Sequence, residues 1–295
     1  MAFAKATLIQ RVRDILGTEE FEDYITADPT TGTNVTVTDT TLWDAGAVGE
    51  FQDDGERFLV RSITNSTVMV VKRGHGGTTA ASSHAVNTVI VRDPVYPYSR
   101  INDSIVQTIN SLWPWAWHME EVELTVDSTK AWYDLTATCI DLIQAFQLTD
   151  GTPTHAKFFG VDGSYKPVII ARNLPSSLVT SGVGARFPRG IFDSDNTIYV
   201  QCRAKVLTTV SGGNYTDLTD EIETETIAWG AAARLVMARE IPRVSEDDTS
   251  MGDATVQPGN RMSIGREVFK RYRELLNDWN DELKRTIPPA KQWNR

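Results

Sequence analysis

The stretch that decides the fold is residues 57–92, which read RFLVRSITNSTVMVVKRGHGGTTAASSHAVNTVIVR. Apolar and polar residues alternate in its strand-like runs, and clusters rich in Gly, Asn and Thr separate the runs. This period of two is typical of short β-strands joined by tight turns. The same alternation begins at Asn34, so we predict a small, hairpin-rich β domain over residues 29–93. The alternating pairs are Val35 and Val37, Phe58 and Val60, Val68 and Val70, and Val89 and Val91.

Helical spacing replaces this alternation on both sides of the β domain. An N-terminal helical segment (residues 1–28) contains an amphipathic helix that should stop at Gly17, a common helix terminator. A central helix (residues 94–117) should be capped by Ser99 and closed by Pro114. Its apolar face consists of Ile101, Ile105, Ile109 and Leu112.

The C-terminal half repeats the sequence of β signals followed by helical signals. Strand-like runs dominate residues 118–212, which we predict to be a second β domain. Residues 213–287 form a C-terminal helical body of two helices, the first ending at Pro242, with a polar loop to about Asn260. Residues 288–295 form an extended tail. The sequence therefore predicts an α+β fold with a helical body and two β-rich, barrel-like or sandwich-like units.

Composition narrows the classes of protein to which the chain can belong. With 295 residues, 41% hydrophobic and 23% charged, it resembles an ordinary globular protein with no membrane span. We expect no export signal, because Arg11 and Arg13 interrupt the apolar part of the N-terminus. Cys139 and Cys202 give no disulfide framework and fit small core residues. The net charge of −10 argues against a surface that grips nucleic acid.

The glycine-rich segment of residues 72–84, KRGHGGTTAASSH, is the most conspicuous short motif. It lacks the lysine and the following helix that a phosphate-binding loop needs. Its two histidines, His75 and His84, do not fit a zinc spacing. We interpret the segment as a turn between strands whose glycines need positive φ angles. We predict no metal site and no cofactor.

Catalytic patterns are equally weak. Ser181 and Ser211 lie near glycines but not in the GxSxG context of a nucleophile elbow. Adjacent carboxylates such as Asp53 and Asp54 should both be solvated if they lie in a loop. We therefore predict no catalytic residues and no enzyme. A group of three tryptophans could stack on a sugar or a base, but we favour a place in the core or in a contact between subunits for it. It consists of Trp113, Trp115 and Trp117.

The order of these patterns resembles that of structural proteins of tailed bacteriophages. In that pattern, a strand pair leads to an R-G-x-x-G-T-x-A-x-x-H turn, then to a strand and a helix containing I-N. Ile109 and Asn110 match the helix. The turn is matched by Arg73, Gly74, Gly77, Thr78, Ala80 and His84. With the helices at the end, the whole chain is similar to a head-to-tail connector, the adaptor beneath the portal.

The resemblance implies a function without an active site. Adaptors of this kind form rings, usually of twelve copies, in the neck of a virion assembled in the host cytoplasm. The partners implied are other copies of the chain, the portal protein, the next neck or tail protein, and genomic double-stranded DNA that passes through without specific binding; no membrane is involved. The C-terminal segment of an adaptor commonly reaches into the portal. The portal-contact residues implied here are Lys284, Arg285, Pro288, Pro289, Lys291, Trp293 and Arg295.

Two alternatives remain open. A tail-side structural protein, such as a tail terminator, baseplate or minor tail protein, would share the β motif. A carbohydrate-binding module of a different class would use the tryptophan group as its platform. The position of the protein in a virion distinguishes the first alternative, and glycan-dependent quenching of tryptophan fluorescence distinguishes the second.

Overall fold

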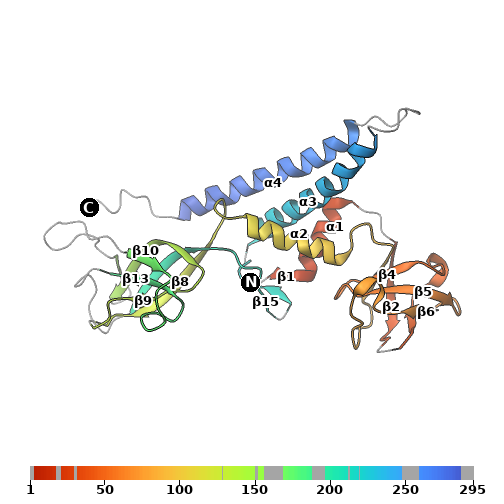
Figure 1. Ribbon diagram of the computed structural model, residues 1–295, viewed down its shortest axis with the longest axis horizontal. Helices are drawn as coiled ribbons and strands as arrows, with labels where there is room; N and C mark the ends of the chain where they lie inside the picture. Colours follow the sequence, from red (N-terminus) through yellow and green to blue (C-terminus); the bar gives the residue numbers. More distant parts are fainter. Residues whose placement is uncertain are drawn as a thin grey trace. The chain divides into compact units, whose positions relative to one another are not determined.

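The fold of the chain is α+β, as predicted, with four α-helices and several antiparallel sheets among the residues described by the computed structural model (Figure 1). The chain divides into two units, Met1–Asn110 with Thr208–Leu275 and Ser111–Leu207 with Leu276–Arg295, which we describe separately. None of the described helices is long and apolar enough to cross a membrane. The structure describes residues 3–17, 21–29, 32–127, 129–149, 152–155, 169–187, 197–211, 213–218, 220–247 and 259–286.

The first unit contains a closed barrel of six antiparallel strands in the order β2-β3-β6-β5-β4-β7 (Figure 1). Alternate side chains fill its interior, and Ile25, Phe51 and Phe58 are completely buried there. The predicted β domain is thus a barrel, whose closure leaves no unpaired strand edge. The strands are β2 (Phe21–Ala27), β3 (Asn34–Val37), β4 (Val48–Phe51), β5 (Arg57–Ile63), β6 (Val68–Lys72) and β7 (Val89–Arg92), with short 3-10 turns at η1 (Thr40–Leu42) and η2 (His75–Gly77).

Strand β2 closes the barrel but falls within residues 1–28, for which the sequence predicts a helical segment. Its alternation is hidden because the buried position beside Ile25 is taken by a carboxylate, Asp23. The indole nitrogen of Trp43 donates to Asp23 Oδ2 at 3.1 Å inside the barrel. A buried polar residue with a partner thus occupies a position at which a hydrophobic pattern expects an apolar one.

The described residues form four α-helices: α1 (Lys5–Leu16), α2 (Tyr98–Ser111), α3 (Glu221–Asp247) and α4 (Gly259–Thr286). Helix α1 ends at Gly17 in the left-handed conformation, with φ of 58°, as predicted. Residues of α2 and α4 both approach α3 closely at Gly230. A Cβ atom at that position would lie 2.5 Å from Cγ2 of Thr108 and 2.8 Å from Cε2 of Tyr272. Glycine is needed there because any side chain would collide with both neighbours.

Two helix boundaries differ from those predicted. Helix α2 begins at Tyr98, so Ser99 lies in the first turn and is not the N-cap. Helix α3 continues past Pro242 to Asp247. Proline removes a single hydrogen bond to the preceding turn while its φ angle suits a helix, so it interrupts the bonding without always ending the element. Of the loop predicted after Pro242, residues 248–258 lie outside the described residues.

The second unit is a β-sandwich with one shared core. Its four-stranded sheet has the order β11-β10-β14-β8, and its three-stranded sheet the order β12-β13-β9. Side chains of both sheets, among them Ala145, Val200 and Ala185, form one hydrophobic cluster. The strands are β8 (His118–Thr125), β9 (Tyr133–Asp134), β10 (Cys139–Thr149), β11 (Thr152–His155), β12 (Ile169–Arg172), β13 (Val183–Arg186) and β14 (Thr197–Ala204). A separate small sheet of the first unit joins β1 (Phe3–Ala4), β16 (Asn214–Tyr215) and β15 (Val210–Ser211).

Candidate functional site

The glycine-rich motif lies between β6 and β7 and folds back over the turn that joins β4 to β5. Three of its glycines have positive φ angles, Gly74 at 64°, Gly76 at 65° and Gly77 at 86°, as the sequence predicts for a turn. A Cβ atom on Gly74 would also lie 3.0 Å from the carbonyl oxygen of Thr78. The glycines therefore allow a tight reversal that carries Arg73 and His84 toward the same point.

That point is Glu56, which the sequence analysis did not single out. Glu56 is buried, with 2% of the residue exposed, and its carboxylate accepts hydrogen bonds from both ends of the motif. Arg73 Nε donates to Oε1 at 2.8 Å, and Arg73 Nη2 donates to Oε2. The backbone nitrogens of Gly74 and Ala81 donate to Oε1 at 3.2 Å and to Oε2 at 2.8 Å. We call the set of Arg73, Gly74, Ala81 and His84 around Glu56 the Glu56 clasp.

The clasp fixes the ionisation state of Glu56. Burial raises the pKa of this carboxyl, but the hydrogen bonds it accepts, that from Arg73 foremost, outweigh burial and lower the pKa to about 2. A bidentate arginine pair in a buried position is strong only when its remaining atoms are also bonded. Arg73 Nη2 meets this condition by donating in addition to the carbonyl oxygen of Ala81 at 3.0 Å. Glu56 therefore remains an anion that joins the two ends of the motif.

His84 is the second buried element of the clasp. Its ring stacks on Phe51 with centroids 3.8 Å apart and 11° between the planes. Nδ1 lies 2.9 Å from Oδ2 of Asp53, and Nε2 lies 3.0 Å from Oε2 of Glu56. Burial lowers the pKa of His84, but the hydrogen bonds to Asp53 and Glu56 outweigh burial, so its pKa is raised. Nε2 also lies 2.9 Å from Nη2 of Arg73. It can donate to Glu56 when protonated and accept from Arg73 when neutral.

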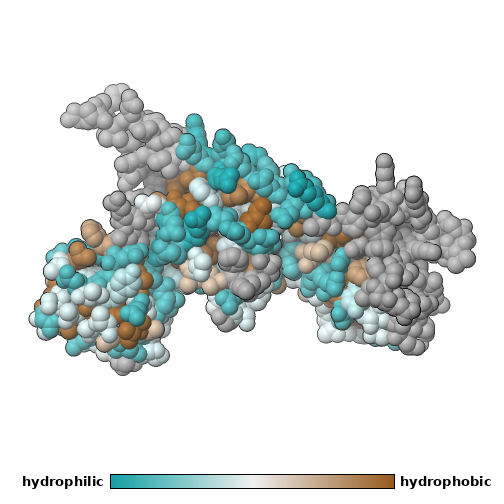
Figure 2. All heavy atoms as spheres, turned by 180° about the vertical axis from the view of Figure 1, so that it is seen from behind, coloured by the Kyte–Doolittle hydropathy of each residue, from teal (hydrophilic) through white to brown (hydrophobic). Residues whose placement is uncertain are grey.

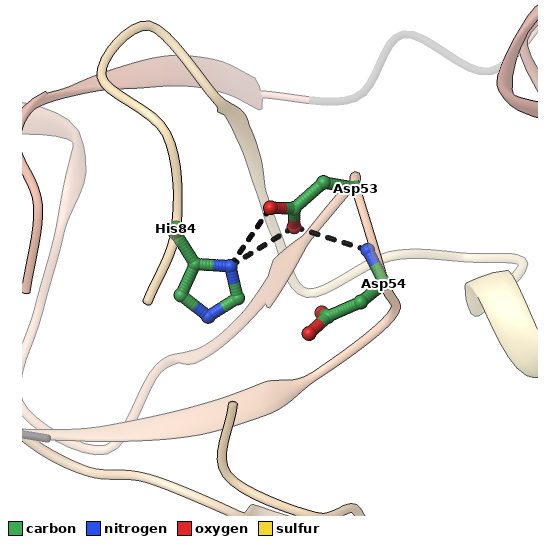
Figure 3. Close-up of side chains that lie close together, drawn as sticks. All are labelled: Asp53, Asp54 and His84. Atoms are coloured by element: carbon green, nitrogen blue, oxygen red, sulfur yellow. Dashed lines mark hydrogen bonds and ion pairs between the residues drawn. The ribbon is translucent and has the colours of Figure 1, made fainter. Parts of the chain in front are cut away.

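Asp53, Asp54 and His84 form a group that could be considered for a metal ion, since one ligand atom of each lies within 4.8 Å of the others (Figure 3). In Figure 3 the Asp53 carboxylate faces the imidazole edge. When the ring is protonated, Nδ1 donates to that carboxylate, and a metal bound at Nδ1 would have to displace this proton. Asp54 instead accepts from the backbone nitrogen of Glu56 at 2.8 Å. The hydrogen bonds account for the arrangement as a structural network.

The remaining motif residues complete the turn. Thr78 Oγ1 accepts from the backbone nitrogen of Arg57 at 3.0 Å and donates to the carbonyl oxygen of His75 at 3.0 Å. It thereby joins the motif to β5. Ala80 is exposed and adjoins Gly74. A Cβ atom on Gly77 would have open space around it, so the positive φ of Gly77 is the reason for glycine at that position.

A second polar contact joins the barrel to the helices of the same unit. Glu50 of β4 is fully buried and accepts from the backbone nitrogen of Tyr98, at the start of α2, at 2.8 Å. Arg13 of α1 lies 3.5 Å from the same carboxylate oxygen. Burial raises the pKa of Glu50, although the bond from Tyr98 and the charge of Arg13 oppose that effect. Three elements thus meet at one carboxylate, which no local sequence pattern indicated.

The three tryptophans proposed as subunit contacts have different environments. Trp115 is 60% exposed, whereas Trp117 is 4% exposed and lies under the guanidinium group of Arg203, 5.1 Å from the ring centroid. Trp113 precedes Pro114 across a cis peptide bond and is partly buried. Of the three, Trp115 offers the most surface to a partner.

The residues proposed for the portal contact are only partly described. Lys284 and Arg285 are exposed in the last turn of α4, and Lys284 Nζ lies 3.0 Å from Oδ1 of Asp281. The others, Pro288, Pro289, Lys291, Trp293 and Arg295, lie outside the described residues.

Comparisons with known proteins add no relative: neither the models of known protein families nor the curated proteins include a match to the chain.

Proposed function

We propose that the chain is a structural protein of a tailed-phage virion, the head-to-tail adaptor that forms a ring under the portal, extends the DNA channel and docks the next ring of the neck or tail. It works by assembly, and its partners are copies of itself, the portal protein and the next neck or tail protein. DNA passes through the ring without specific binding.

The observation that carries the proposal is the Glu56 clasp. The resemblance to phage proteins rests on the motif from Arg73 to His84, and the motif's buried polar side chains bond within the barrel. Thr78 and the positive-φ glycines complete the same turn. This use of the motif supports a role in building a rigid module, which a ring subunit requires.

The charge of the chain supports the second part of the proposal. Each copy carries a net charge of −10, so a ring of many copies would be strongly acidic. A channel wall of that sign repels phosphates and provides no cations to displace their counterions, which lets DNA slide. A channel wall dominated by Lys and Arg in an assembled ring would contradict this part.

Cryo-electron microscopy of the virions, with a tag on this chain as a marker, tests the proposed function. We expect one ring of density between the portal and the tail. Density at the distal tail would favour the tail-side alternative, and particles without the chain would contradict both readings. Saturable quenching of tryptophan fluorescence by a glycan, lost in Trp115→Ala, would favour the carbohydrate-binding module.

A further inference from the structure

Helix α4 carries a charge pattern that repeats every seven residues. Arg266 is followed by Glu267, and seven positions later Arg273 is followed by Glu274. Residues seven apart lie on the same side of a helix, and consecutive residues are separated by about 100° around its axis. The two arginines therefore form one side of the exposed surface, and the two glutamates form the other. We call them the arginine side and the glutamate side of α4.

The opposite surface of α4 faces the body of the first unit. Val268 and Leu275 are each 8% exposed, and Tyr272 approaches α3 at Gly230. All four charged residues of the repeat are exposed, whereas Val268 and Leu275 are buried and Tyr272 is partly buried. The charged repeat therefore lies on the solvent-exposed surface of α4. Figure 2 shows this helical part as a largely hydrophilic surface with scattered hydrophobic side chains.

The arginine side has features of a contact surface. Phe269, which is 40% exposed, lies between Arg266 and Arg273 in the sequence, within one turn of each. No ion pair joins either arginine to a carboxylate among the residues for which the structure gives contacts. Arginine and aromatic residues are the types that contribute most at protein interfaces. The two arginines and the exposed ring of Phe269 would therefore bind an acidic partner surface that also has apolar side chains.

The glutamate side supplies the complementary charge. Glu274 lies 3.3 Å from Arg271 and 3.9 Å from Lys270, and all three side chains are about half exposed or more. Such exposed pairs contribute little and exchange partners easily. When two copies of α4 lie parallel and in register, Arg266 of one is at the height of Glu267 of the other, because consecutive residues differ by only about 1.5 Å along the axis. The same holds for Arg273 and Glu274.

We infer that the arginine side of α4 docks against the glutamate side of α4 in the next copy of this chain. Two different sides of the exposed surface of α4 meet in this contact, so each copy keeps one free side on which a further copy can dock. Such heterologous contacts generate closed rings or filaments. A two-fold dimer through the arginine side would instead place arginines against arginines. The inference therefore favours a ring over a dimer, and it rests on the proposed adaptor function.

Two charge-reversed proteins test the contact. The variant Arg266→Glu/Arg273→Glu carries two acidic sides, and Glu267→Arg/Glu274→Arg carries two basic sides. We expect each variant alone to self-associate about a hundredfold more weakly than the unchanged chain, because like charges then meet. Mixed in equal amounts, the two variants should assemble again. Sedimentation velocity of the full chain at low and high salt measures this, with circular dichroism as the check on folding.

The matched control for Arg266→Glu/Arg273→Glu is Arg61→Glu/Lys72→Glu, which makes the same change of net charge at exposed barrel positions. It should assemble like the unchanged chain. Variants that assemble normally on their own would overturn the α4 contact, as would an unchanged chain that stays monomeric at low salt. Neither result would move the protein from the neck of the virion in electron microscopy, so failure of this contact and failure of the adaptor function are distinguishable.

Discussion

Arg73 holds Glu56 with two nitrogens at once, Nε donating to Oε1 at 2.8 Å and Nη2 donating to Oε2. Seventeen positions separate the two residues, and the contact joins the motif after β6 to the turn between β4 and β5. The side chains of Arg73 and Glu56 are 7% and 0% exposed. A pair buried to this extent is costly to break on one side only, since the remaining charge loses its partner.

Replacing Glu56 by glutamine should therefore destabilise the barrel by about 3–5 kcal/mol, because Arg73 would be left as an uncompensated buried cation. Faster hydrogen exchange in peptides from residues 57–72 and a lower denaturation midpoint would measure the loss. Glu22→Gln is the control, since Glu22 is exposed on β2 of the same barrel. Equal stability of the two variants would contradict the central place given to the Glu56 clasp.

The clasp predicts how barrel stability depends on pH. The folded-state pKa of His84 is raised above 6.5, so its contribution is complete below that pH and declines as pH rises through the folded-state value. The pKa of Glu56 is lowered from 4.5 to about 2, so its contribution is complete above 4.5 and declines as pH falls toward 2. Stability should therefore be greatest between pH 4.5 and 6.5. The alkaline decline should be shallow, because Nε2 of His84 can then accept from Arg73.

Denaturation midpoints measured across this range check the pH profile. His84→Gln should lower stability and flatten the alkaline side, because glutamine does not titrate. An alkaline decline that remains in this variant would assign it to a group other than His84.

The packing of α2, α3 and α4 predicts the effect of a single added methyl group. Gly230→Ala should destabilise the helices by about 1–3 kcal/mol, since the new Cβ would collide with Thr108 and Tyr272. The second substitution Thr108→Ser removes the closest methyl group and should restore part of the loss. Its hydroxyl can still donate to the Ser104 carbonyl oxygen, as that of Thr108 does at 2.8 Å. Thermal unfolding of both variants gives the measurement, and a stabilised Gly230→Ala would show that the helices are less tightly packed.

The two cysteines should be unreactive in the folded protein. Cys139 and Cys202 are both fully buried, and their mutual hydrogen bond together with burial raises the pKa of Cys202. Alkylation by iodoacetamide should therefore follow unfolding of the sandwich, because the reagent does not reach a buried sulfur, even at Cys139, whose pKa the hydrogen bond with Cys202 lowers. Leu178→Cys, at a position that is 51% exposed, provides a reactive control in the same unit. Rapid labelling of the native cysteines would contradict their place in the core.

The assignment of the portal contact predicts the effect of a truncation. Removing residues 288–295 should abolish docking on portal-bearing heads and leave the fold unchanged, because the sequence predicts a short tail after two prolines that adds little to a core. Co-sedimentation with heads measures docking, and circular dichroism checks the fold. Unchanged co-sedimentation would transfer the contact to another part of the chain.

The periodicity of apolar residues predicted the described helices and most of the barrel, because alternation such as that of Phe58 and Val60 indicates which face of a strand is buried. It failed at β2, where Asp23 occupies a buried position, and at Pro242, which lies inside α3. At β2, the hydrogen bond from Trp43 allows a carboxylate at a buried position, against the rule that buried positions are apolar. At Pro242, the helix continues, against the rule that proline ends a helix. The sequence also indicated the turn glycines correctly, because φ is a local property of the backbone.

The sequence alone determined most of the elements and the glycines of the turn, which depend on neighbours within a few positions. Only the tertiary structure decided which side chains the glycine-rich motif of residues 72–84 contacts. His84 meets Glu56 across 28 positions and Asp53 across 31, and Asp53 had looked like an ordinary solvated residue. The physical reason is that a buried charged side chain is stable only when the closed barrel brings hydrogen-bond partners to it. The distance between such partners is not encoded by their spacing along the chain.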